Sequence, residues 1–236
     1  MLNATMTNSV IRAALMGDIV HSERAADPAW LHKTFNAVVD RGNGRRDGLD
    51  SPLTITLGDE FQALATSFVA AASIARDIRL ELLELDVECR FAIGVARIDT
   101  PVNRDRAWNM MGPGLAATRE RLNEKSATNL YRFVLPDDPL LETMIEASGA
   151  TLTAIERGWS ATQRRDIAAL LRGEDVAGIA RRRNVTVHNI YKVRASGDYD
   201  LYRLQWQAVG EALSVLDRRY HMPGAEQWST RSFTLA

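Results

Sequence analysis

The sequence predicts an α+β protein with a sheet in its N-terminal part and only helices in its C-terminal part. Strand and helix patterns alternate as far as Pro136, no strand pattern follows it, and the helical remainder carries a basic segment. We therefore expect an α/β domain over residues 1–136 and a helical domain over residues 137–236.

The first part contains four predicted strands separated by three predicted helices. Apolar and β-branched runs predict strands at 10–20, 53–57, 87–98 and 129–135. Apolar residues at helical spacing predict helices at 28–41, 61–85 and 112–122. Asp27 is a suitable N-cap for the first helix, which begins at Pro28, and the second is predicted from its many alanines.

Residues 159–197 carry the pattern of a helix-turn-helix. Ser160 and Gln163 have the spacing of a capping box at the start of one helix. Further on, Ala180 is small enough for two helices to cross, Asn184 tolerates the left-handed conformation of a tight turn, and Thr186 can cap the helix that follows.

The helix after Thr186 would lie in the major groove of DNA. We expect Asn189 to read an adenine edge and Lys192 to bind a guanine or a phosphate. The predicted DNA-contacting residues are Thr186, His188, Asn189, Tyr191 and Lys192. Residues 160–197 hold eight Arg or Lys against three acids, a net +5 in a chain of net −1, which favours DNA as a partner. The alternative is a three-helix structural or protein-binding domain with a solvated basic face.

A final helix is predicted over residues 198–220, with a wide apolar stripe. Core packing accounts for most of such a stripe. Part of it could also contact a second copy, and a homodimer would suit a helix-turn-helix because paired half-sites raise affinity.

Two predicted strands end in acidic residues, Asp18 and Asp59, each directly after a glycine. If these strands are neighbours, the two carboxylates converge at one end of the sheet. Hard divalent cations such as Mg²⁺ or Mn²⁺ prefer oxygen ligands of this kind. The alternative for Gly58-Asp59 is a hairpin turn, which this dipeptide favours, and Asp18 alone would be a strand-terminal cap.

The segments MGDIV, TLGDEFQ, RFAIGVA and GPGLAATR, with the later helical segment, resemble the SatD family over nearly the whole chain. The first three segments are also similar, more distantly, to class III nucleotidyl cyclases and GGDEF diguanylate cyclases, which share a ferredoxin-like palm fold. This resemblance implies a ferredoxin-like N-terminal domain in which Asp18, the Ile19 carbonyl and Asp59 hold metal. It further implies that Glu60 lies beside them and that Arg119 faces a nucleotide phosphate.

The chain departs from the cyclase pattern at three positions. Ile55 stands where class III cyclases carry a lysine, Leu115 where they carry an asparagine, and Leu57 replaces the first glycine of GGDEF proteins. Metal binding survives these departures better than phosphoryl transfer does, because the transfer needs both attacking and leaving oxygens positioned.

Composition narrows the remaining function classes. Hydrophobic residues at 46% and charged residues at 25% are typical of a globular protein. The single cysteine, Cys89, rules out an internal disulfide and predicts a small buried side chain. No signal-peptide pattern or membrane-length apolar run is present, so we expect a cytoplasmic protein that does not enter a membrane.

Three hypotheses follow. The leading one is a DNA-binding, transcription-regulatory protein whose N-terminal domain senses a nucleotide with Mg²⁺. The second is an enzyme, a Mg²⁺-dependent nucleotidyl cyclase or nucleotidyl transferase. The third is an inert palm-like domain that serves only assembly.

Overall fold

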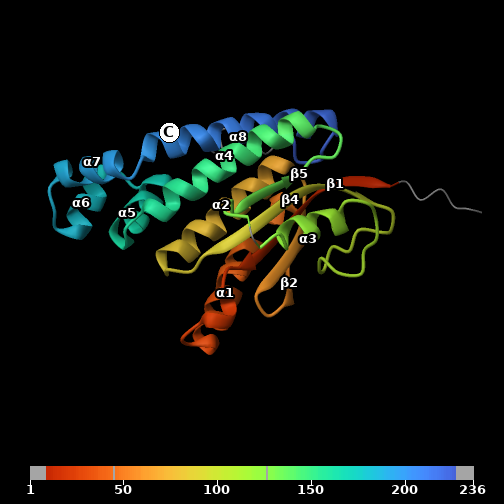
Figure 1. Cartoon of the computed structure of the whole chain (residues 1–236), viewed down its shortest axis with the longest axis horizontal. Coiled ribbons are helices and arrows are strands. Elements are labelled where there is room, and N and C mark those ends of the chain that lie inside the picture. The colour runs from red at the N-terminus through yellow and green to blue at the C-terminus, as the bar shows by residue number, and fades with distance from the viewer. Residues whose placement is uncertain (1–8, 45, 126, 227–236) are drawn as a thin grey trace, which may run out of the picture.

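A five-stranded sheet forms the centre of the protein, which is described by a computed structural model over residues 9–44, 46–125 and 127–226 (Figure 1). The strands are β1 (Val10–Ile19), β2 (Leu49–Leu57), β3 (Glu60–Ala65), β4 (Cys89–Ile98) and β5 (Tyr131–Val134). Their order across the sheet is β2-β3-β1-β4-β5. Neighbouring strands are antiparallel except for β4 and β5, which run parallel.

Helices fill the rest of the described chain. They are α1 (Pro28–Asn43), α2 (Phe68–Glu84), α3 (Leu115–Leu122), α4 (Pro139–Gly158), α5 (Ala161–Leu171), α6 (Val176–Arg183), α7 (Val187–Ser196) and α8 (Tyr199–Arg219). Short 3-10 turns occupy Ser22–Arg24 and Arg46–Gly48. The order β1-α1-β2-β3-α2-β4 is a βαββαβ unit, a pattern that ferredoxin-like proteins share. The predicted mixed α+β class is confirmed.

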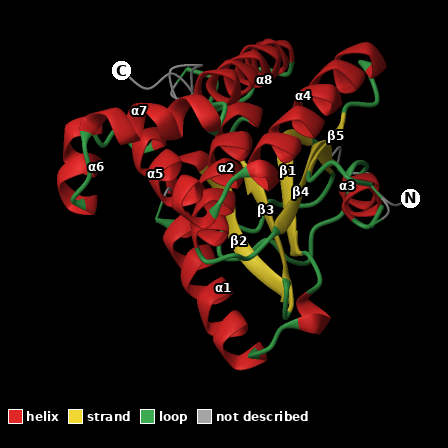
Figure 2. Ribbon diagram, turned by 60° about the vertical axis from the view of Figure 1, so that its left-hand side comes forward, coloured by secondary structure: helices red, strands yellow, loops and turns green. Residues whose placement is uncertain are grey.

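The two faces of the sheet are covered differently. Helices α1, α2 and α4 pack on one face, and α3 packs on the other (Figure 2). Alternation along β1 follows this division: Ala13 and Leu15 join the large core under α2, whereas Ala14 and Met16 face the α3 side. Asp18 continues the second set, so its side chain lies on the α3 face of the sheet.

The prediction of one helix over residues 61–85 is wrong at its start. Residues 60–65 form β3, which pairs with β1 and β2, and the helix begins only at Phe68 with Ser67 as its N-cap. Alanines favour a helix in isolation, but pairing with two strands and the burial of Phe61 outweigh that local preference here. Gly58-Asp59 is consequently the turn of the β2–β3 hairpin, which was the alternative interpretation of that dipeptide.

Only helices follow β5 in the described part of the chain, as the sequence predicts. Helices α4 and α8 lie side by side, and α8 also packs on α2 (Figure 1). Buried residues on both sides of Pro136, such as Phe133 and Trp206, belong to one hydrophobic cluster. The domain boundary near 136 stays a prediction.

Among the described residues, no helix combines the length and the apolar character that crossing a membrane requires.

Candidate functional site

Three acidic residues lie together at one end of the sheet. Asp18, near the end of β1, is the register partner of Glu60, the first residue of β3. Asp59 occupies the adjoining hairpin turn, and its carbonyl accepts a hydrogen bond of 3.0 Å from the Ile19 N–H. The hairpin thus brings acidic residues from two distant parts of the sequence to the same end of the sheet. This end, the acidic edge, comprises Asp18, Asp59 and Glu60.

Each of these carboxylates contacts a partner within the protein. Asp18 Oδ2 lies 3.3 Å from Nε of Arg90, its register partner on β4, and the two side chains are 10% and 9% exposed. Glu60 Oε1 lies 3.2 Å from an Arg119 Nη atom and accepts a hydrogen bond from the Thr56 hydroxyl. Asp59 accepts one from the Ser22 hydroxyl. The carboxylates are therefore neutralised or hydrogen-bonded without any added group.

Burial at this edge changes the protonation of Asp18. Its pKa is raised to about 6, chiefly because the buried carboxyl is shielded from water, with the nearby Asp59 adding to the rise. Arg90 and Lys125 oppose the rise without cancelling it. Asp18 can therefore exchange a proton near neutral pH, which an ordinary surface aspartate does not do.

A preformed divalent-cation cage does not fit this arrangement. Within the described residues, no group of three or more His, Cys, Asp or Glu side chains could hold a metal ion. Two guanidinium groups also contact the carboxylates that would have to bind the cation. The Mg²⁺ or Mn²⁺ site at Asp18, Ile19, Asp59 and Glu60 therefore stays a prediction.

A pocket of about 420 Å³ opens on the same α3 face, beside Glu60. Met16, Gln62 and Leu64 line it from the sheet, Leu115 and Arg119 from α3, and residues 107–110 from the preceding loop. Trp108, half exposed, offers an aromatic ring at this rim. Lining of this kind, apolar with a few polar groups at one end, is typical of small-molecule sites.

Arg119 links the pocket to the acidic edge. One of its Nη atoms donates to Gln62 Oε1 at 2.8 Å and lies 3.2 Å from Glu60. Gln62 in turn donates to the Ala107 carbonyl in the loop. The sequence interpretation included Arg119 but missed Arg90, Gln62 and Trp108. Strand alternation places Gln62 on the same face as Glu60, but its partners come from segments that no local pattern connects.

The predicted turn between α6 and α7 is present in the C-terminal helices. Asn184 adopts the left-handed conformation, with φ 53°, and the Val185 N–H donates to the Ala180 carbonyl at 3.0 Å. The Thr186 hydroxyl accepts from the Asn189 N–H at 3.3 Å and caps α7. Ile190 packs in the core. The two helices are consequently held at an angle by a turn that the sequence specifies locally.

One face of α7 is open to solvent. The predicted DNA-contacting residues are all exposed: Thr186, His188, Asn189, Tyr191 and Lys192. Several nearby arginines pair with acids, among them Arg182 with Glu174 and Arg183 with Asp166. Within the described part of the chain, Arg181 and Lys192 form no ion pair. The local positive field is therefore smaller than the formal charge indicates.

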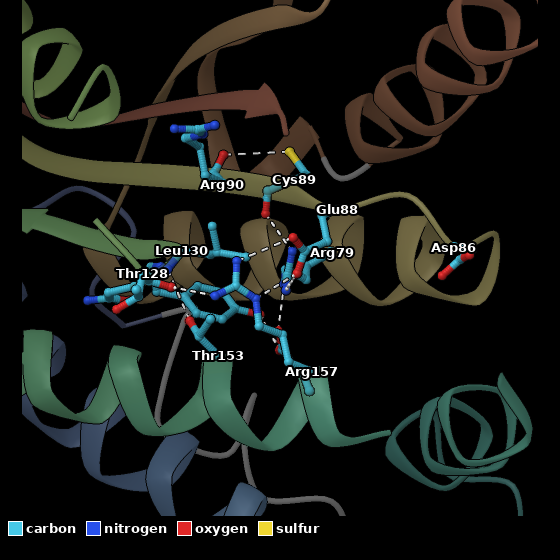
Figure 3. Close-up of polar contacts among 12 residues, drawn as sticks. Arg79, Asp86, Glu88, Cys89, Arg90, Thr128, Leu130, Thr153 and Arg157 are labelled. Carbon is cyan, nitrogen blue, oxygen red and sulfur yellow. Dashed lines mark hydrogen bonds and ion pairs between the residues drawn. The ribbon is translucent and has the colours of Figure 1, made fainter. Parts of the chain in front are cut away.

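A buried polar cluster, which the sequence interpretation missed, joins the sheet to the C-terminal helices. Arg79 of α2 donates from Nε to Glu156 of α4 at 2.6 Å. It also donates from Nη1 to the Cys89 carbonyl of β4 at 2.6 Å (Figure 3). Tyr131 of β5 and Tyr202 of α8 both donate to Glu156 Oε1, at 2.6 and 2.8 Å. Burial, reinforced by Glu156, raises the pKa of both tyrosines well above the usual value. The cluster therefore connects five elements, α2, α4, α8, β4 and β5, through buried hydrogen bonds.

Cys89 lies at this junction with its thiol enclosed by the core. Its side chain is fully buried, as predicted, and burial raises the pKa of its thiol. A thiol in this state is neither nucleophilic nor an available ligand.

Comparison with known proteins places this geometry in context. No curated protein matches the chain. Two solved structures, each of a bacterial light-regulated adenylyl cyclase, overlap it with TM-scores of 0.40 and 0.39 at 15% and 13% sequence identity. Each match covers 53% of this chain and 43% of the cyclase chain, so less than half of that protein's length is spanned. The sequence profile of the SatD family matches residues 12–186, which include the acidic sheet end, the pocket and the turn after α6, and the chain belongs to the SatD family.

Proposed function

We propose that this SatD-family protein binds duplex DNA through α7 and acts as a transcription regulator. The observation that carries the proposal is the exposed polar face of α7, which directly follows the left-handed turn at Asn184. In a helix-turn-helix the first helix crosses the backbone while the second enters the major groove. Helix α6 ends in three arginines, residues 181–183, next to where a backbone would pass.

The side chains of α7 suit both kinds of DNA contact. Asn189 can make paired hydrogen bonds with an adenine edge, and Lys192 can reach a guanine or a phosphate. The start of α7 at Thr186 presents backbone N–H groups to a phosphate. Since few cationic groups here lack an acidic partner, we expect a moderate fall in affinity with added salt.

Fluorescence anisotropy of the full chain with a pool of random duplex DNA, at low salt, tests this proposal. Binding that weakens with salt and is lost in Lys192→Gln with Asn189→Ala would support it. Lys33→Gln removes an exposed charge on α1 instead and should leave binding unchanged. Absence of duplex binding at the lowest salt would overturn the proposal in favour of a protein-binding helical module.

The pocket beside the acidic edge favours a second function, the binding of a nucleotide by the sheet domain. An apolar pocket with Trp108 at its rim suits a base, and Arg119 at its polar end suits a phosphate. Thermal melts with ATP or GTP, each with Mg²⁺ or with EDTA, measure such binding. Stabilisation that is lost in Arg119→Gln would support it, and no response to either nucleotide would count against it.

Measuring the turnover of ATP or GTP distinguishes the rival hypothesis, an enzyme, from a nucleotide sensor. A cyclase or nucleotidyl transferase would convert ATP or GTP to product, and Asp18→Asn would abolish the conversion. A sensor would bind the nucleotide and leave it intact. The departures at Ile55 and Leu115 favour the sensor, because the residues that cyclases use at these positions are missing.

The buried Arg79–Glu156 cluster gives a physical route between the two sites. It joins Cys89, the neighbour of Arg90, to Tyr202 near the start of α8, and α8 directly follows α7. A nucleotide would regulate DNA binding only if it bound two arrangements of these elements with different affinity. DNA affinity measured with and without the nucleotide reports that difference directly.

We also propose a homodimer through α8, which exposes Leu201, Leu204 and Val215 along one side. In an antiparallel pair, Leu201 and Leu204 near the start of one α8 would meet Val215 near the end of the other. Sedimentation of the full chain should show a dimer that Leu204→Glu dissociates. A monomer at all concentrations would contradict this assembly.

A further inference from the structure

The geometry points to Arg90 and Arg119 as internal replacements for divalent cations at the acidic end of the sheet. Palm domains of the kind that this sequence resembles neutralise two acidic residues with bound metal. Here a guanidinium group from a neighbouring strand and another from α3 contact Asp18 and Glu60. The inference concerns the chain's own charges and holds whether or not the pocket binds a nucleotide.

The register of the sheet positions Arg90, the first of the two proposed replacements. Glu60, Asp18 and Arg90 are direct partners on the adjacent strands β3, β1 and β4, and all three project from the α3 face. Side chains of direct antiparallel partners start about 5 Å apart, so they interact without any movement of the backbone. Arg90 is therefore built into the sheet beside Asp18 as firmly as Glu60 is.

Helix α3 positions Arg119, the second of the two proposed replacements. Arg119 reaches from α3 to Glu60 on the sheet below it, and Gln62 accepts a further hydrogen bond from the same guanidinium. The carboxylate of Glu60 thus has a positive partner on the α3 face of the sheet. A guanidinium group keeps its charge at every accessible pH, so it does not give way by losing a proton.

The charges at this edge balance without a metal. Asp18, Asp59 and Glu60 supply three potential negative charges, and Arg90, Arg119 and Lys125 supply three positive ones. A divalent cation would add two uncompensated positive charges and would have to displace the guanidinium groups. Mg²⁺ and Mn²⁺ would also have to lose bound water to do so, which Mg²⁺ resists strongly.

The first test is a titration of the wild-type protein with MnCl₂. Binding is measured by calorimetry and by the paramagnetic resonance signal of free Mn²⁺. We expect no saturable binding and no rise in Tm with Mn²⁺ or Mg²⁺. Saturable Mn²⁺ binding to the wild-type protein that disappears in Asp18→Asn would overturn the inference.

Removal of the two guanidinium groups is the second test. The double variant Arg90→Gln, Arg119→Gln leaves Asp18 and Glu60 without their cationic partners, so we expect it to gain Mn²⁺ binding and a rise in Tm of several degrees with Mn²⁺. Adding Asp18→Asn should abolish that gain. Arg97→Gln is the matched control, since Arg97 lies exposed on the same strand and has no ion pair within the described residues, and it should gain nothing.

If the double variant does not fold, the single variant Arg119→Gln replaces it in the Mn²⁺ titration. The Arg119 side chain is 42% exposed, so the fold should tolerate its loss. A smaller but measurable gain in Mn²⁺ binding is expected there. A folded variant that gains no Mn²⁺ binding would show that these arginines do not stand in for cations, and would overturn the inference.

Discussion

Two clusters of carboxylate and guanidinium groups in this protein differ in how completely they are enclosed. In the interior cluster, the Arg79 and Glu156 side chains are both 0% exposed, and Glu156 accepts hydrogen bonds from Arg79, Tyr131 and Tyr202. In the cluster at the sheet edge, Arg119 is 42% exposed and a pocket adjoins it. The first arrangement supports structure, whereas the second leaves room for a ligand.

Hydrogen bonding separates the two clusters less clearly than exposure does. Both Glu156 oxygens are used: Oε2 accepts from Arg79, and Oε1 accepts from Tyr131 and Tyr202. At the edge, Arg90 Nε is buried and makes no hydrogen bond within the described residues, although Asp18 lies 3.3 Å away. In the interior cluster, Arg79 Nη2 is likewise buried without a hydrogen bond within the described residues. Unsatisfied buried donors are uncommon, but each cluster holds one, so they do not distinguish the two clusters; the exposed Arg119 side chain and the adjoining pocket do. The difference teaches that charge pairing alone does not separate a structural cluster from a candidate site.

Glu156→Gln tests the interior cluster and should have the largest effect. It leaves Arg79 buried without its anion, so we expect the free energy of unfolding to fall by about 3–5 kcal/mol. Urea denaturation measures this change. Glu211→Gln, on the exposed side of α8, should change it by less than about 0.5 kcal/mol. A small change in unfolding free energy on Glu156→Gln would mean that the Arg79–Glu156 pair contributes little to stability. The contrast between a structural cluster and a candidate site would then fail.

Asp18→Asn tests the edge cluster through pH. The raised pKa of about 6 means that the folded state holds the proton more tightly than the unfolded chain. The resulting stabilisation is full below about pH 3.8 and is lost as pH rises through about 6. Between these pH values the unfolding free energy should therefore decline less steeply in Asp18→Asn than in the wild-type protein. The two slopes should differ by up to about 1.4 kcal/mol per pH unit.

Asp217 titrates in the same window, because burial also raises its pKa to about 6. It accepts hydrogen bonds from the N–H groups of Phe68 and Val69 at the start of α2, far from the sheet edge, and it is intact in Asp18→Asn. Some pH dependence must therefore remain in the variant. Equal slopes in the wild-type protein and Asp18→Asn would show that Asp18 titrates normally.

Arg119→Gln should have the smallest effect on stability. Its ion pair with Glu60 is partly exposed, and such pairs contribute roughly 0–1 kcal/mol. We therefore expect nearly unchanged urea denaturation together with lost nucleotide stabilisation. A loss of stability comparable with that of Glu156→Gln would place Arg119 among the structural residues.

Predictions from the sequence succeeded where the interactions span a few residues. The caps at Asp27, Ser160 and Thr186 and the turn at Asn184 each depend on groups three or four positions apart, and all are present. The helix predicted from residue 61 failed at its start, because β3 exists only through pairing with strands that lie elsewhere in the chain.

By itself, the sequence determined the α+β class, the C-terminal helices, the exposed face of α7 and the presence of acidic residues at the ends of two strands. These follow from periodicity, capping and turn preferences, which are local. Only the tertiary structure decided that Arg90 contacts Asp18, that Arg119 contacts Glu60 and that Arg79 meets Glu156, 77 positions away. The physical reason is that a charged side chain carries no sequence pattern for its partner, since sheet register and helix packing select that partner.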